Sequence, residues 1–243
     1  MVRKILIIPD VHGRAFWRKP CKDDWDKIVF LGDYVDPYPG EAEQSDVMGE
    51  LIDIVEFKRQ NPDKVVLLWG NHDCFYWCEP YRRQLDYWSR HDNLRHDDIQ
   101  AFFRENLDKF QWAYEQDGFL FTHAGVNNSM GKLLVEEYDK LNADVINDFF
   151  NKEQNQMLLA MVSYYRGGPE DFSSIIWTDV REHYGKMPID ALKKYYQIFG
   201  HTYLTRNIVT KWFAMLDTGG DWNYIEDGIL KDQNGEELKI EKL

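Results

Sequence analysis

The stretch Lys4-Ile5-Leu6-Ile7-Ile8-Pro9-Asp10-Val11-His12 decides how the rest of this chain is interpreted. An apolar run of strand length leads directly into a carboxylate and an imidazole. Such a run is typical of a buried parallel strand whose carboxyl end carries functional groups. Asp10 and His12 alternate just past that end, so both side chains can point to the same side of the sheet.

Two further apolar runs repeat this arrangement. Residues 27–31 lead into Gly32-Asp33, and residues 64–69 lead into Gly70-Asn71. Between them, residues 45–60 keep apolar side chains at i, i+3 and i+4 spacing, which predicts a helix. Strand, helix and strand in this order indicate the βαβ unit of an α/β domain.

The later part of the chain continues the pattern. Gln116-Asp117-Gly118 indicates a hairpin whose second strand runs into His123, and Gly200-His201 follows another apolar run. Residues 131–165 are predicted to form a pair of helices. In the C-terminal tail, Asn234-Gly235 indicates a hairpin turn between two strands.

The polar residues that follow these runs form a donor set for two divalent metal ions. Asp33 can bridge two cations, Asn71 offers a neutral amide oxygen, and the histidines offer imidazoles. Mixed oxygen and nitrogen donors suit Mn, Fe, Zn or Co better than Mg or Ca. Two cations roughly 3.5–4 Å apart would hold a bridging hydroxide for in-line attack on phosphorus. The predicted ligands are Asp10, His12, Asp33, Asn71, His123 and His201.

The departing alkoxide of such a reaction needs a proton. His72, next to Asn71, is the candidate donor, and Asp36 is expected to pair with it. A carboxylate beside an imidazole favours the protonated form and raises its pKa. We therefore assign the catalytic positions to His72 and Asp36.

Composition limits the possible partners and location of the protein. The chain has 243 residues with 29 Lys and Arg against 42 Asp and Glu, a net charge of −13. This balance disfavours a broad electrostatic grip on nucleic acid, so a phosphate site would depend on its cations. The sequence contains no apolar run of roughly 18 residues, as a membrane span would need. Three cysteines without framework spacing fit a reducing compartment, and we expect a cytoplasmic protein.

The order and spelling of these motifs resemble the calcineurin-like metallophosphoesterase superfamily. The segment Gly32-Asp33-Tyr34-Val35-Asp36 is most similar to the serine/threonine phosphoprotein phosphatase and dinucleoside-tetraphosphatase branch. The resemblance implies two mixed β-sheets packed as a sandwich with flanking helices, a four-layer α/β fold. It implies one domain over residues 1–243, with a helical insert around residues 126–172 walling the active site. It also implies a first metal on Asp10 and His12, a bridge at Asp33, and a second metal on Asn71, His123 and His201.

Four positions depart from the pattern of that branch or of the wider superfamily. Tyr203 stands where many members have a second histidine, and Pro37 and Phe75 stand where the branch usually has arginine. Asp73 replaces the usual glutamate. The phosphate clamp must therefore come from elsewhere, because a dianionic monoester gains most from bidentate guanidinium contacts. The candidates, each of which could instead be a solvated side chain, are Arg14, Arg166 and Arg181.

We expect a two-metal phosphoesterase, with Mn as the first choice and Fe, Zn, Co or Ni as alternatives. Hydrolysis of a phosphate monoester is the first hypothesis, with a phosphorylated small molecule, nucleotide or phosphoprotein as substrate. Cleavage of a nucleotide pyrophosphate or phosphodiester is the second, and a non-catalytic binding scaffold is the third. One aromatic group favours core packing over a base-stacking platform; it comprises Phe75, Tyr76, Trp77, Tyr81, Tyr87 and Trp88.

Overall fold

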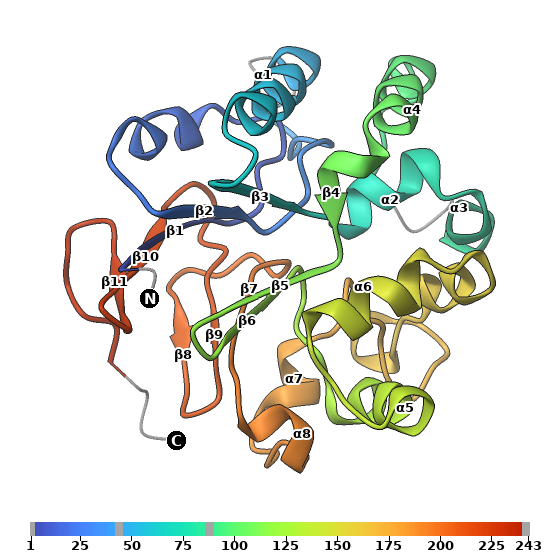
Figure 1. The fold of residues 1–243 in the computed structure, drawn as a ribbon. Coiled ribbons are helices and arrows are strands. Elements are labelled where there is room, and N and C mark those ends of the chain that lie inside the picture. The colour runs from blue at the N-terminus through green and yellow to red at the C-terminus, as the bar shows by residue number, and fades with distance from the viewer. Residues whose placement is uncertain (1–2, 42–45, 86–89, 240–243) are drawn as a thin grey trace.

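The computed structural model describes residues 3–41, 46–85 and 90–239 and contains two mixed β-sheets flanked by helices (Figure 1). The first sheet has the strand order β11-β10-β1-β2-β3-β4, and the second has the order β5-β6-β7-β9-β8. This confirms the predicted α/β fold with two mixed sheets. The strands are β1 (Lys4–Ile8), β2 (Lys27–Phe30), β3 (Val65–Leu68), β4 (Phe110–Gln111), β5 (Ala113–Gln116), β6 (Phe119–Thr122), β7 (Tyr196–Phe199), β8 (Ile208–Val209), β9 (Phe213–Met215), β10 (Asn223–Glu226) and β11 (Ile229–Asp232).

Alternation along the strands of the first sheet produces two separate apolar layers. In β1, Ile5 and Ile7 pack in a cluster that includes Phe121 and Ile198 of the second sheet. Leu6 belongs instead to the cluster that covers the opposite face of the first sheet with helices. Successive side chains point to opposite faces of a strand, so a fully apolar strand can support both layers.

Helices cover the outer faces of both sheets in Figure 1, with α1 and α4 beside the first sheet and α5 to α8 beside the second. Helix α1 begins after Asp46, whose side chain accepts a hydrogen bond from Gly49 N. Ser45, the expected N-terminal residue of this helix, lies outside the described residues. The α-helices are α1 (Val47–Gln60), α2 (Asn71–Trp77), α3 (Glu79–Leu85), α4 (His96–Glu105), α5 (Asn128–Tyr138), α6 (Ala143–Asn151), α7 (Val180–His183) and α8 (Asp190–Lys193). The short 3-10 helices are η1 (Phe16–Arg18), η2 (Pro20–Lys22), η3 (Leu107–Lys109), η4 (Glu153–Ala160) and η5 (Tyr164–Arg166).

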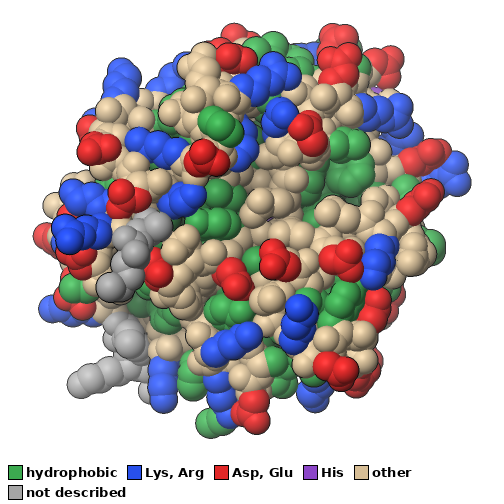
Figure 2. Space-filling view, viewed as in Figure 1, with side chains coloured by type: hydrophobic (Ala, Val, Ile, Leu, Met, Phe, Trp, Pro, Cys, Tyr) green, Lys and Arg blue, Asp and Glu red, His purple; other side chains and the backbone are tan. Residues whose placement is uncertain are grey.

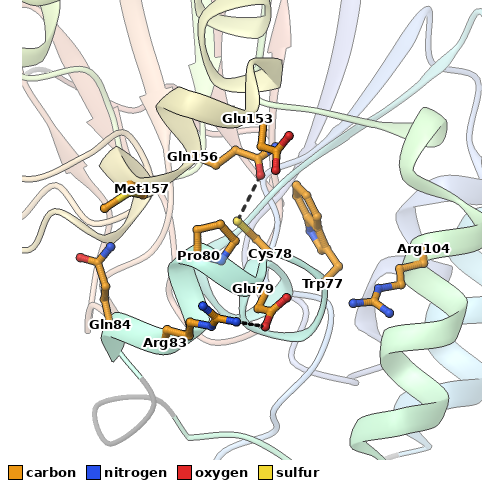
Figure 3. Close-up of a pocket in the computed structure, with 10 residues that line it drawn as sticks. All are labelled: Trp77, Cys78, Glu79, Pro80, Arg83, Gln84, Arg104, Glu153, Gln156 and Met157. Atoms are coloured by element: carbon orange, nitrogen blue, oxygen red, sulfur yellow. Dashed lines mark hydrogen bonds and ion pairs between the residues drawn. The ribbon is translucent and has the colours of Figure 1, made fainter.

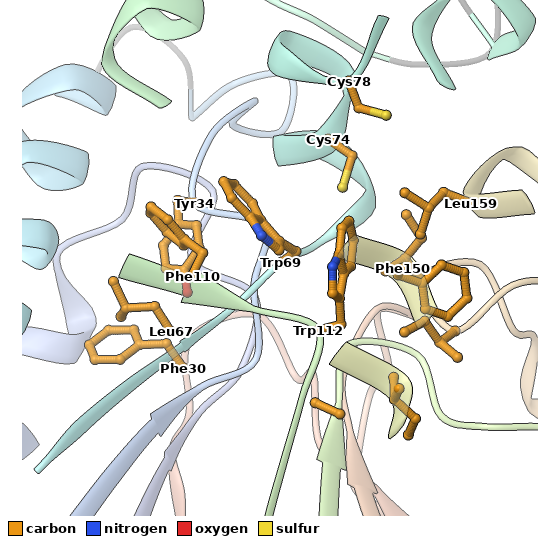
Figure 4. Close-up of a cluster of buried hydrophobic side chains, with 14 of the residues drawn as sticks. Phe30, Tyr34, Leu67, Trp69, Cys74, Cys78, Phe110, Trp112, Phe150 and Leu159 are labelled. Carbon is orange, nitrogen blue, oxygen red and sulfur yellow. The ribbon is translucent and has the colours of Figure 1, made fainter. Parts of the chain in front are cut away.

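A large aromatic core joins the first sheet to α2 and α6 (Figure 4). The Trp69 ring stacks on Phe110 with 4.2 Å between ring centroids and lies near the ring of Trp112. Of the aromatic group considered as a base-stacking platform, Phe75, Tyr76 and Tyr81 are buried, which confirms core packing for these three. Trp77 is half-buried, while Tyr87 and Trp88 lie outside the described residues.

The C-terminal segment forms two turns, the predicted one at Asn234-Gly235 and a hairpin that was not predicted. Strands β10 and β11 pair antiparallel around Asp227-Gly228, where both residues have positive φ. Asn234-Gly235 forms a second turn after β11, closed by an isolated bridge between Lys231 and Glu237. An Asp-Gly pair is as good a hairpin signal as Asn-Gly, and here the upstream pair lies between the two strands.

Surface charge is distributed without a dominant sign on the face shown in Figure 2. Lys and Arg side chains lie interspersed with Asp and Glu side chains, with apolar side chains between them. Among the described residues, no helix is both long and apolar enough to cross a membrane.

Candidate active site

Strand ends deliver the predicted metal ligands to one place. His12 follows β1, Asp33 follows β2, and Asn71 follows β3 at the first residue of α2. His123 and His201 come directly after β6 and close after β7 of the second sheet. The carboxyl ends of strands from both sheets therefore meet, and the polar residues that the sequence placed there come together.

One carboxylate connects two groups of potential ligands. The His12 Nε2 atom lies 3.7 Å from Asp33 Oδ2, and His123 Nε2 lies 3.6 Å from the same oxygen. Asp33 thus belongs to both groups, as a bridging ligand would. The groups are Asp10, His12 and Asp33 on one side, and Asp33, His123 and His201 on the other.

The second group also includes the amide oxygen of Asn71. Asn71 Oδ1 lies 2.9 Å from His123 Nε2 and 3.0 Å from His201 Nδ1, and these two nitrogens are 3.1 Å apart. Because His123 Nδ1 donates to the Leu31 carbonyl at 2.8 Å, a neutral His123 has only a lone pair at Nε2. The lone pair of His123 Nε2 therefore faces the Asn71 oxygen, with no hydrogen between the two atoms. A cation bound by both atoms would relieve this repulsion.

Backbone carbonyls orient two of the imidazoles. His12 Nδ1 donates to the Val35 carbonyl at 2.8 Å, as His123 Nδ1 does to that of Leu31. With Nδ1 donating to a carbonyl, Nε2 is the nitrogen that remains available to a metal. Histidines that bind metals commonly donate their other ring N–H to a carbonyl in this way. Burial lowers the pKa of His12 to about 3 and lowers the pKa of His123, so both rings are held neutral.

A buried carboxylate oxygen without a partner supports the same fit. Asp10 Oδ2 is buried and has no hydrogen-bond partner among the described residues. Burial raises the pKa of Asp10 well above its usual value, and the neighbouring carboxylates of Asp217 and Asp33 raise it further. Divalent cations would offset this accumulated negative charge, so the donor set fits a dinuclear centre.

The backbone at the site is held in an uncommon conformation. His12, Asp33, Asp36 and His201 have φ values of 48°, 52°, 61° and 72°, in the left-handed region. Residues other than glycine adopt this region at a cost, and such strain concentrates at functional sites. At Gly70, a Cβ would lie 2.2 Å from Asp33 Oδ1, so only glycine leaves room for the Asp33 carboxylate.

The predicted acid pair lies beside the metal-ligand cluster. His72 Nδ1 donates to Asp36 Oδ2 at 2.8 Å and also approaches the Arg90 carbonyl at 3.1 Å. The His72 ring centroid is 5.2 Å from that of His12. Burial alone would lower the pKa of His72, but the carboxylates of Asp33 and Asp36 outweigh it and raise the pKa. Tyr76 donates its hydroxyl hydrogen to Asp36 Oδ1 and thereby supports the pair.

Comparison with known families identifies this arrangement. A family model described as calcineurin-like phosphoesterase matches residues 3–204. The chain belongs to the calcineurin-like phosphoesterase family. It is therefore a hydrolase acting on phosphate esters, in a family that generally binds a dinuclear divalent metal centre.

A solved phosphatase structure shares this fold. A serine/threonine phosphatase from Saccharomyces cerevisiae with similarity to human phosphatase PP5 shares 13% identity and a TM-score of 0.54, over 99% of this chain and 81% of that chain. The crystal structure of a candidate diadenosine tetraphosphatase shares 15% identity and a TM-score of 0.47, over 98% and 93%. A comparison with curated proteins finds no significant match.

Of the three arginines proposed from the sequence, one lines the cleft over the predicted ligands and two do not. Arg166 lines the cleft above the cluster, and its Nη2 donates to Thr202 Oγ1. The Arg14 guanidinium donates to the carbonyls of Asp10 and Val11 at 2.7 and 3.0 Å. Arg181 forms an ion pair with Asp179 at 2.7 Å, and its side chain is 56% exposed. Neither Arg14 nor Arg181 is among the residues lining the cleft.

Sequence reasoning missed Arg90, which also lines the cleft. Its guanidinium lies over the Tyr38 ring, 4.0 Å from the centroid, and its carbonyl accepts from His72. Arg90 lies in no motif, so only the docking of its segment onto His72 could reveal it.

Asp73 has a positioning function that the sequence comparison recorded only as a departure. Its carboxylate accepts hydrogen bonds from the backbone N–H groups of Asp33, Tyr34 and Gly70 at 2.8 to 2.9 Å. Asp73 therefore ties the loop after β2 to the loop after β3. The only indication of this contact in the sequence was the position of Asp73 at the end of the polar motif Gly70-Asn71-His72-Asp73.

Cavity size alone would not have selected this site. The cleft over the cluster has a volume of about 260 Å³, whereas a cavity between α3, α4 and η4 has about 800 Å³ (Figure 3). Acidic and basic side chains line the larger cavity together, and Glu79 pairs with Arg83 inside it. None of the predicted site residues lines it, so the chemistry of its residues rather than its volume distinguishes the candidate site.

Proposed function

We propose that this phosphoesterase hydrolyses phosphate monoesters, in the manner of protein phosphatases, and that residues 1–243 form one catalytic domain. The observation that carries this proposal is that two guanidinium groups and one candidate proton donor line the same cleft. Arg90 and Arg166 line the same cleft as His72. Two cationic side chains suit the dianionic end of a monoester better than the single charge of a diester.

We assign the metal ligands as the sequence predicted them, with Asp33 as the bridge. When bound, the two cations would act as Lewis acids on the phosphoryl group and activate water as the nucleophile. Manganese is the first choice of metal, and iron, zinc, cobalt and nickel are alternatives that suit the mixed donor set. The proposed ligands are Asp10, His12, Asp33, Asn71, His123 and His201.

Protein side chains would then bind the negatively charged phosphate and supply a proton to the leaving group. Arg90 and Arg166 bind the non-bridging phosphate oxygens and orient the leaving group towards His72. Since His72 Nδ1 is occupied by Asp36, the proton for the leaving alkoxide comes from Nε2. Asp36 keeps the ring in this orientation and stabilises its protonated form.

The helical segment 126–172 is proposed to form one wall of the substrate cleft. It contains α5, α6, η4 and η5, and Arg166 at the end of η5 reaches the cleft. A phosphorylated small molecule, nucleotide or phosphoprotein would fit this proposal as substrate. The three cysteines are free thiols, which supports our proposal of a cytoplasmic location.

Matched chromogenic substrates test the function. The Mn-loaded protein should turn over p-nitrophenyl phosphate with a kcat/KM about tenfold or more above that for bis-p-nitrophenyl phosphate, because a bidentate charge-assisted contact is worth over 1 kcal/mol. Both substrates release p-nitrophenolate, so leaving-group chemistry cancels. Protein treated with a chelator provides the baseline. Preference for the diester would contradict the monoesterase proposal and favour a phosphodiesterase or nucleotide pyrophosphatase.

A further inference from the structure

Tyr203 is an exposed aromatic residue at the mouth of the active-site cleft. It is 58% exposed, and it lines the cleft together with Arg90 and Arg166. Tyr164 and Tyr184 are also exposed, but neither lines this cleft. Hydrolysis of the phosphate ester does not itself need an exposed aromatic ring beside the two arginines. The ring is therefore expected to have another function.

The turn that carries Tyr203 is rigidly held. His201 N donates to Asp10 Oδ1 at 2.9 Å, and Thr202 N donates to the Gly200 carbonyl at 2.9 Å. On the other side, Leu204 N donates to the Asp217 carbonyl at 2.8 Å. Hydrogen bonds on both sides of Tyr203 fix its backbone, so its ring is presented with little loss of freedom on binding.

The ring itself is supported from two directions. A Cβ at Gly219, which has a φ of +82°, would lie 2.6 Å from Tyr203 Cε2, so the ring packs directly against this glycine. Tyr38 contacts the ring edge-on, with 6.1 Å between centroids and 64° between planes. Tyr38 is itself covered by the Arg90 guanidinium, which leaves Tyr203 as the accessible aromatic surface of the pair.

Phosphate bound in the cleft would lie beside this surface. Arg166 donates to Thr202, the residue directly before Tyr203, and Arg90 lies over the partner ring of Tyr38. A group attached to that phosphate would leave the cleft past the Tyr203 ring. Aromatic rings prefer other aromatic rings in stacked or edge-on contact, beyond the gain from area alone.

We infer that Tyr203 is a specificity residue that binds a planar aromatic group of the substrate close to the phosphate. This inference rests on the proposed phosphoesterase function and narrows its substrate to aromatic phosphates. The aromatic group belongs to either an aryl side chain or a nucleobase, which share the same stacking chemistry.

Competitive inhibition separates this inference from the function it rests on. Inhibition constants are measured against p-nitrophenyl phosphate for benzylphosphonate and for cyclohexylmethylphosphonate, which differ in the planarity of the ring. We expect benzylphosphonate to bind about tenfold more tightly to the native protein, as aromatic contacts allow. In Tyr203→Ala this ratio should approach one, whereas Tyr203→Phe should retain it.

Controls make each result decisive. Tyr184→Ala removes an exposed tyrosine outside the cleft and should keep the native ratio. Adenosine 5′-monophosphate and ribose 5-phosphate form a second pair, and loss of their ratio in Tyr203→Ala identifies a nucleobase, whereas loss of the benzyl ratio alone identifies an aryl group. Equal ratios in the native protein and Tyr203→Ala for both pairs would overturn the inference. A native protein that does not turn over p-nitrophenyl phosphate with any of the proposed metals would instead refute the proposed function.

Discussion

The floor and the rim of the cleft are built in different ways. The floor consists of ligand-type side chains such as Asp33 and His123, which follow strands and are almost fully buried. The rim consists of Tyr38, Arg90 and Tyr203, which lie on connecting segments and are half-buried or exposed. The floor is a product of the sheets, whereas the rim is a product of loops that differ in length and sequence between proteins.

This difference separates the chemistry from the choice of substrate. Floor residues are held by hydrogen bonds to the backbone, such as those that the imidazoles of His12 and His123 donate to the carbonyls of Val35 and Leu31. The side chains of the rim also contact one another, such as Arg90 over Tyr38 and Tyr38 edge-on to Tyr203. Changes in the floor should therefore abolish the reaction, and changes in the rim should alter which ester is hydrolysed and how tightly it binds.

The largest effect should come from the centre of the floor. We expect Asp33→Asn to lower kcat/KM by about 10³-fold or more, because Lewis-acid stabilisation of the transition state is worth several kcal/mol. Bound metal, measured by atomic emission, should fall together with activity. Asp139→Asn, at an exposed helix end with a similar positive φ, is the matched control and should retain both. Full activity in Asp33→Asn would contradict the assignment of the floor.

A change at the acid pair should remove proton transfer without removing the metals. We expect His72→Asn to lower kcat by about 10²-fold on an alkyl phosphate, the usual contribution of a general acid. The loss should be much smaller on p-nitrophenyl phosphate, whose leaving group needs no proton. Asp36→Asn should show the same dependence on leaving group in weaker form. Equal losses on both substrates would mean that His72 acts only by supporting Asn71.

The two arginines that line the cleft should affect binding more than turnover. We expect Arg90→Ala and Arg166→Ala each to raise KM by about tenfold, the loss of one charge-assisted contact to phosphate. Arg181→Ala, which removes an exposed guanidinium paired with Asp179, should leave KM at the native value. Steady-state kinetics with a phosphate monoester measures all three. An equal effect of all three changes would indicate a general charge effect instead of a clamp.

A buried histidine outside both regions should have the smallest effect and act on stability. Burial lowers the pKa of His183 to about 4, below its usual 6.5, so the folded state favours the neutral ring. This contribution to stability is present above pH 6.5 and is lost as the pH falls from 6.5 towards 4. His183→Gln cannot gain the proton, so its stability deficit relative to the native protein should shrink by about 1 kcal/mol between pH 7.5 and pH 5.5. Urea unfolding at the two pH values measures this, and a constant deficit would contradict it.

The floor could be predicted from sequence because its residues are tied to strand ends. Asp10 follows an apolar run that forms β1 as expected, and Asn71 follows β3 in the same way. The parallel arrangement of these strands then brings the side chains together without further information. The pairing of His72 with Asp36 also followed from residue type, with 2.8 Å between the two atoms in the structure.

The rim could not be predicted in this way, because its contacts join segments that no motif connects. Arg90 lines the cleft where its carbonyl accepts a hydrogen bond from His72, which is 18 residues earlier. Arg181 was proposed from its neighbours in sequence, yet Asp179 attracts its guanidinium. The hairpin at Asp227-Gly228 shows the same limit, since a second adequate turn signal at Asn234-Gly235 drew attention away from it and only strand pairing shows that both turns form.

The carboxylate of Asp73 has a consequence for how metals enter the protein. By accepting hydrogen bonds from the N–H groups of Asp33, Tyr34 and Gly70, it holds the loops after β2 and β3 as one unit. The proposed ligands Asp33 and Asn71 should therefore need no backbone rearrangement to receive ions. Metal loading should then proceed at the pace at which a hydrated cation sheds its water, and exchange of one metal for another should leave the spacing between Asp33 and His72 unchanged.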